Sequence, residues 1–238
     1  MKNKLIKIAQ YKMFISHDPA HELEHVKRVV ENVEKIAKSY DISGIDMDAL
    51  VLSAWWHDFS RSRINKPPSF FWMIFLDDII SAWYLFVLSI KNKSLSKVVF
   101  WAILILLAKS LVGGRIFKFL FFRKDRKILV DILGDADYLD VMKYDRILKT
   151  MPIAKTNKYY RLAYKKLIEM NLKDKKIRLK TKEALSIFKK IVNDLIVFLQ
   201  QDWVYSWHEE LFGDKWCQWV LFKLKELSVI IDRELIKK

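Results

Sequence analysis

The sequence is poor in residues that make turns and cross-links. Among 238 residues there are 5 glycines and 4 prolines, whereas average usage would put the pair near ~12%. So few turn-formers argue against a sandwich or barrel of many short strands and favour long helices. The single cysteine, Cys217, excludes an internal disulfide framework and a cysteine-rich zinc site.

Acidic residues are also scarce, with 28 Asp and Glu against 43 Lys and Arg, for a net charge of +15. Such an excess suggests a nucleic-acid or membrane partner. It resides in residues 62–127, with net +9, and residues 143–190, with net +12. Between them, residues 128–142 carry 4 Asp and no Lys or Arg, and such packed carboxylates need nearby cations or a metal. This distribution makes nucleic acid the least favoured partner, behind an anionic substrate and a membrane.

Apolar residues recur at helical spacing through most of the chain. We predict a helix over about 19–40 that begins at Asp18-Pro19, and another over about 46–60. Further helices are predicted over 125–150 with a break near Gly134, and over 157–171, 181–201 and 214–235. No convincing alternating pattern of a strand is present, and the hydrophobic content of 52% excludes a disordered chain. The predicted fold class is all-α.

Residues 64–124 differ from the rest because they hold apolar runs interrupted by charges. No run reaches the ~20 residues that cross a bilayer as a helix. Val98–Ala108 is apolar all round, which indicates deep burial or contact with lipid. Three interpretations stay open: buried helices, a homodimer interface, or peripheral contact with an anionic membrane through tryptophans and flanking cations. No signal peptide is evident, so a cytoplasmic location, with or without membrane association, is the default expectation.

The residues best suited to chemistry are histidines and aspartates on predicted helices. His21 and His25 are four residues apart and therefore share a helix face. His57 is followed directly by Asp58, and the acidic segment contains Asp135-Ala136-Asp137-Tyr138-Leu139-Asp140. Imidazole and carboxylate ligands together suit a divalent metal such as Mn, Fe, Co, Ni or Zn.

The order of these motifs resembles that of the HD-domain superfamily of metal-dependent phosphohydrolases, particularly its small stand-alone bacterial members. The resemblance joins Asp18-Pro19-x-His21 and His25-x-x-Arg28-Val29 to His57-Asp58 and to the Asp135–Asp140 stretch. A later segment, Tyr164–Gln201, resembles the family's later helix, with Lys166-Leu167 and Thr181. In all, the similarity covers about 16–61 and 125–201.

The resemblance implies a set of metal ligands: His25, His57, Asp58 and Asp137. Asp137 is preferred to Asp135, which stays open as the alternative ligand. The bound metal, with Mg added to the candidates above, would lower the pKa of its water, the expected nucleophile, and polarise a phosphoryl oxygen. His57 and Asp58 would then be the catalytic pair. His21, Arg28 and Arg61 would bind the substrate phosphate.

The chain departs from the family pattern in two places. No acid occurs in residues 59–63, where some members carry an assisting Glu, so a separate general base is not identified. The two internal histidines of two-metal members are missing between 58 and 135, which disfavours a two-metal site.

These features predict one HD-type helical domain over 1–238. It would contain a basic, apolar helical insertion at 64–124 and a C-terminal helical extension over 202–238. The predicted function is metal-dependent hydrolysis of a small phosphorylated substrate, with a nucleotide favoured. The alternative is a non-catalytic, metal-stabilised module that docks on a membrane or protein partner through its insertion.

Overall fold

A computed structural model describes residues 2–16, 22–63, 73–123, 126–173 and 177–237. These residues form α-helices and one short 3-10 helix and contain no strand, which confirms the predicted all-α class. No helix among them is long and apolar enough to cross a membrane. The chain divides into two compact units, Met1–Asp137 and Tyr138–Lys238. The single domain predicted from the sequence stays a prediction.

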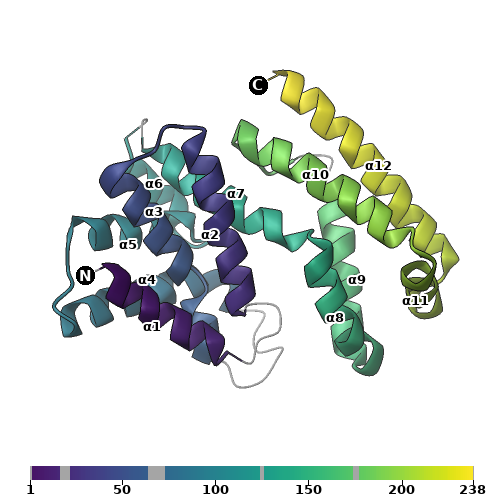
Figure 1. Cartoon of the computed structure of the whole chain (residues 1–238), viewed down its shortest axis with the longest axis horizontal. Helices are drawn as coiled ribbons and strands as arrows, with labels where there is room; N and C mark the ends of the chain where they lie inside the picture. Colours follow the sequence, from purple (N-terminus) through teal and green to yellow (C-terminus); the bar gives the residue numbers. More distant parts are fainter. Residues whose placement is uncertain (1, 17–21, 64–72, 124–125, 174–176, 238) are drawn as a thin grey trace. The chain divides into compact units, whose positions relative to one another are not determined.

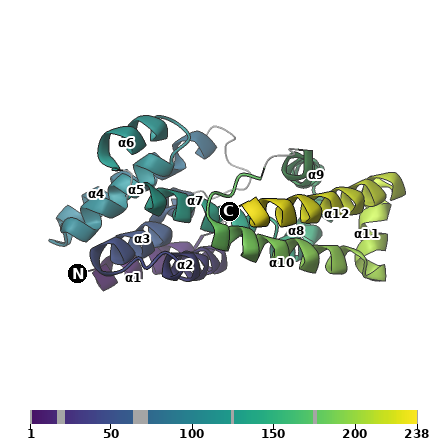
Figure 2. The same ribbon diagram turned by 90° about the horizontal axis from the view of Figure 1, so that it is seen from above.

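The first unit consists of two groups of helices that meet at α3 and α5 (Figures 1 and 2). One group comprises α1 (Lys2–Phe14), α2 (Leu23–Lys38) and α3 (Gly44–Trp56), followed by the 3-10 helix η1 (Phe59–Arg63). The other comprises the insertion helices α4 (Met73–Lys91), α5 (Lys97–Lys109) and α6 (Gly114–Phe121). Helix α7 (Lys127–Val141) contributes the last residues of this unit.

The second unit is built on an antiparallel pair, α10 (Lys182–Leu199) and α12 (Asp214–Lys237), joined by α11 (Asp202–Phe212) (Figure 1). Helices α8 (Tyr144–Thr156) and α9 (Lys158–Lys173) pack on each other, and each contacts one helix of that pair. The side chain of Thr181 caps α10 by accepting a hydrogen bond from the amide of Ala184. The apolar stripe of α10 is buried, as its 3–4 residue spacing predicts.

Two predicted boundaries were wrong. Helix α7 runs without a break through Gly134, and the interruption falls instead at residues 142–143. One glycine costs a helix only about 1 kcal/mol, which flanking helical residues compensate. The start of α2 also lies later than predicted, because Glu22 is extended and the helix begins at Leu23. The predicted start at Asp18-Pro19 lies outside the described residues.

The most apolar helix, α5, is partly buried. Its apolar side chains pack against α3 and α4, and six of its residues are buried, including Leu104, Ile105 and Leu106. Burial therefore accounts for part of the apolar surface of α5, while Phe100 on the same helix is 52% exposed. The other exposed apolar residues of the insertion fall in two sets, one on α4 and the turn after it and one in and before α6.

Candidate metal centre

Four side chains, carried by α2, the end of α3 and α7, converge in the first unit. His25 lies in the first turn of α2, and His57 is the residue that ends α3. Asp58 follows His57, so the two adjacent ligands leave the chain where the helix stops. Asp137 lies on α7. The imidazoles are almost fully buried, and Asp58 is 8% exposed.

The ligating atoms of these residues lie within a few ångströms of one another. The Nε2 atoms of His25 and His57 are 3.2 Å apart. The Oδ2 atom of Asp58 lies 3.1 Å from His25 Nε2 and 3.3 Å from His57 Nε2. The Oδ1 atom of Asp137 lies 3.6 Å from each of these nitrogens. His25, His57 and Asp58 therefore form a group that could hold a metal ion.

The donor set fits a divalent cation on its own chemistry. His57 Nδ1 lies 2.8 Å from the carbonyl oxygen of Ala54 and donates to it. The other ring nitrogen, Nε2, faces the cluster and carries the ligating lone pair when the imidazole is neutral. Such a backbone hydrogen bond is the usual way in which a ligating imidazole is oriented. Ligand nitrogens about 2.1 Å from one metal lie about 3 Å apart, close to the separation of the two Nε2 atoms.

Two further charged residues reach this cluster from the insertion. Lys109, the last residue of α5, places its Nζ atom 3.1 Å from Asp137 Oδ2. The same Nζ lies 3.2 Å from Asp78 Oδ1 on α4. Sequence reasoning treated both residues only as charges that interrupt apolar runs. A signal was present, since a charge inside an otherwise buried apolar helix needs a buried partner.

The pKa shifts follow from burial and from this alternation of charges. Burial disfavours the charged form of His57, but the carboxylates of Asp58 and Asp137 outweigh it and raise the pKa of that imidazole well above its usual value. Burial would raise the pKa of Asp137, yet Lys109 and His57 hold it well below the usual range. Burial raises the pKa of Asp78 despite the opposing effect of Lys109.

Arg61 lies on η1 and belongs to a separate group of polar residues around Asp77. Its guanidinium forms a buried ion pair with Asp77 on α4. Asp77 also accepts a hydrogen bond of 2.9 Å from the hydroxyl of Ser60. The burial of Asp77 raises the pKa of its carboxyl. The predicted contact of Arg61 with a substrate phosphate stays a prediction.

The remaining predicted residues differ in how far the structure describes them. Arg28 is half-buried one turn after His25 on α2, and His21 lies outside the described residues. Asp135 is buried on α7, two residues before Asp137 and therefore on a different face of that helix. Asp137 is the aspartate whose carboxylate lies 3.6 Å from the Nε2 atom of each imidazole. Asp140 is fully buried in the second unit, with its carboxylate 3.7 Å from Arg146.

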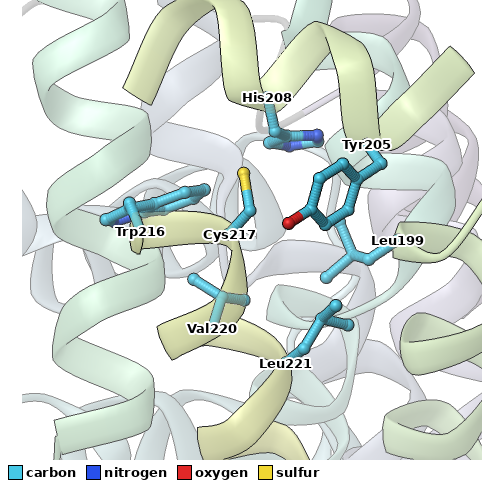
Figure 3. Close-up of a pocket in the computed structure, with 7 residues that line it drawn as sticks. All are labelled: Leu199, Tyr205, His208, Trp216, Cys217, Val220 and Leu221. Atoms are coloured by element: carbon cyan, nitrogen blue, oxygen red, sulfur yellow. The ribbon is translucent and has the colours of Figure 1, made fainter. Parts of the chain in front are cut away.

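A third buried histidine, His208, occupies an aromatic cluster in the second unit (Figure 3). The hydroxyl of Tyr164 lies 2.6 Å from His208 Nε2, and Nδ1 donates to the carbonyl oxygen of Val204 at 2.8 Å. Trp216 stacks on the imidazole at 6.0 Å between ring centroids. The adjoining cavity of about 10 Å³ has room for about one water, so it cannot admit a substrate.

The chain was compared with protein-family models, with curated proteins and with solved structures, and none of the three comparisons finds a match. The resemblance to HD phosphohydrolases therefore stays a prediction from the sequence motifs.

Proposed function

We propose that this protein is a metal-dependent phosphohydrolase that acts on a small phosphorylated substrate, of which a nucleotide is the favoured class. One observation carries the proposal: two imidazole Nε2 atoms and the Asp58 and Asp137 carboxylates converge beside the ammonium group of Lys109. These ligand types suit divalent cations that serve in phosphate hydrolysis. The ordered sequence motifs that resemble those of HD phosphohydrolases support the same assignment.

The proposed role of each residue follows from its position in the site. His25, His57, Asp58 and Asp137 would hold the cation, which supplies a water of lowered pKa and polarises a phosphoryl oxygen. Asp58, whose Oδ2 atom is close to both imidazoles, would also accept a hydrogen bond from the attacking water and so orient it.

Lys109 would act on the reaction through Asp137. Its ion pairs with Asp137 and Asp78 fix the orientation of the Asp137 carboxylate, as other polar partners fix ligands in metal sites. Arg28 and His21 are the proposed phosphate-binding residues beside Arg61. Arg61 would have to share its guanidinium between Asp77 and the substrate.

The test measures metal and hydrolysis in the same samples. The full chain is purified, its metal content is determined, and nucleoside mono-, di- and triphosphates are screened with Mn, Fe, Co, Ni, Zn and Mg. Asp58→Ala should lose both the metal and the activity, because it removes an oxygen close to both imidazoles. Asp194→Ala is the matched control, since Asp194 is an exposed carboxylate on α10.

Two results would contradict the proposal in different ways. If wild type binds metal, loses it in Asp58→Ala and hydrolyses none of the phosphates, the non-catalytic, metal-stabilised module becomes the better explanation. If wild type binds no divalent metal at all, both the enzyme and the metal-stabilised module are wrong.

A further inference from the structure

The insertion carries an exposed apolar surface between Leu111 and Leu120. We call it the α6 surface, and it consists of Leu111, Val112, Ile116, Phe119 and Leu120. Phe119 is 80% exposed and Leu120 is 64% exposed. Single exposed apolar residues are ordinary, but Ile116, Phe119 and Leu120 lie three and four residues apart and share one face of α6, and a grouped apolar surface marks an interaction site.

The rest of α6 is anchored to its own unit. Helix α6 packs against α5, and Lys118 on α6 pairs with Asp131 on α7 at 2.6 Å. The turn before it is tightly built, because a side chain at Gly114 would meet the carbonyl oxygen of Ala108 at 2.8 Å. The α6 surface is therefore presented by a defined turn and an anchored helix.

The charge around this surface identifies what it contacts. Residues 111–123, which span the surface, contain three cations and no Asp or Glu, and Lys118 among them is paired with Asp131. Two of these cations, Arg115 and Arg123, are exposed beside the apolar residues. Each cation near an anionic bilayer is worth ~1 kcal/mol, which adds to the burial of apolar side chains at the lipid interface. A second copy of this chain would instead bring two cationic faces together, which like-charge repulsion opposes.

We propose that the α6 surface docks the protein on the surface of an anionic lipid bilayer, with Phe119 and Leu120 inserted at the interface and Arg115 and Arg123 at the headgroups. Leu111 is two residues after Lys109, the lysine of the candidate metal centre. Docking therefore holds that centre close to the bilayer. The proposal is independent of hydrolysis, so it stands or falls separately from the proposed function.

The test is flotation of the full chain with vesicles of phosphatidylcholine alone and of phosphatidylcholine mixed with phosphatidylglycerol. Wild type should bind the anionic vesicles, and binding should weaken with added salt. The double variant Phe119→Ser, Leu120→Ser should lower the partition coefficient by about tenfold or more, because it removes two apolar side chains from the interface. Ile236→Ser, which changes an 86% exposed apolar residue in the second unit, is the matched control and should bind like wild type.

A second variant, Arg115→Ser with Arg123→Ser, keeps the test independent of any loss of folding in the first. It should bind anionic vesicles several-fold more weakly than wild type. Failure of wild type to float with anionic vesicles would overturn the proposal. Unchanged vesicle binding by the folded Phe119→Ser, Leu120→Ser variant would also overturn it. So would a wild-type dimer, detected by sedimentation, that this variant dissociates, since the α6 surface would then bind a second copy of the chain.

Discussion

The two units each bury histidine, and the surroundings of the imidazole differ in nearly every respect. In the first unit, His25 and His57 face two carboxylates and a lysine. In the second unit, His208 faces the rings of Trp216 and Phe212 and one tyrosine hydroxyl. Burial alone therefore does not indicate what a histidine does. The number of charged groups around it does, because charges retained in an interior need a purpose or a partner.

The difference also appears in the pKa shifts. Carboxylates raise the pKa of His57 despite its burial, whereas burial lowers the pKa of His208 because no carboxylate offsets it. The thiol beside His208 follows the same rule, since burial raises the pKa of Cys217 to about 11. The second cluster is therefore neutral and unreactive at physiological pH, and we assign it to the packing of α9, α11 and α12.

The largest expected effect comes from Lys109→Met, which removes the cation that Asp78 and Asp137 share. It breaks two ion pairs between partly buried side chains, and we expect a loss of about 3 kcal/mol in the free energy of unfolding. Urea unfolding of the metal-free protein measures it. Added divalent cation should reduce the loss, because it would neutralise Asp137.

Lys118→Met is the control for that variant. Lys118 pairs with a single aspartate, Asp131, so its removal breaks one ion pair and not two. Its loss should cost about 1 kcal/mol or less. If the two variants lose equal free energy of unfolding, Lys109 forms only an ordinary surface ion pair and is not part of the metal centre.

The next effect separates the two histidine clusters by metal binding. His57→Asn should weaken the binding of a divalent metal by more than about 100-fold. Removing even a residue that only hydrogen-bonds to a ligand lowers metal affinity by about 10–100-fold. His208→Asn should leave metal affinity unchanged, because His208 faces aromatic rings. Titration calorimetry with Mn²⁺ measures both. Equal weakening by the two substitutions would remove the distinction on which the comparison rests.

The smallest effect is on the pH dependence of stability. The pKa of His208 is lowered in the folded protein, so the unfolded chain takes up its proton first. The contribution of His208 to stability is therefore complete above the unfolded pKa of about 6.5, and it declines as the pH falls from there toward the folded pKa. The slope for one group is at most about 1.4 kcal/mol per pH unit.

The measurement is urea unfolding between pH 7 and pH 5 for wild type and for His208→Gln, which cannot titrate in this range. Wild type should lose more stability than the variant over that interval. Parallel curves would mean that His208 is not the group responsible, and the assignment of the second cluster would need another titrating residue.

Several parts of the fold could be read from the sequence because they depend on local spacing. The stripes of α2 and α10 predicted their buried faces, since side chains three and four residues apart share a helix face. The end of α7 could not be read in this way. The break occurs at residues 142–143 and not at Gly134, and glycine disfavours a helix too weakly to decide its end.

The candidate metal centre was also predicted from the sequence only in part. His25, His57, Asp58 and Asp137 were predicted from the order of motifs, and the structure brings these four together. Lys109 and Asp78 were missed. They lie 31 residues apart in the chain and meet only because α4 and α5 pack on each other.

What the sequence determined by itself is the helical class and the ligand types, because helix periodicity and metal chemistry depend on residues and their spacing. Only the tertiary structure decided which apolar runs of the insertion are covered. Val98–Ala108 and Ile116–Phe121 are both mostly apolar, yet α5 buries six residues, in contact with α3 and α4, while α6 leaves Phe119 and Leu120 exposed. The physical reason is that burial also depends on which other helices pack against a segment, and the sequence of the segment does not name those helices.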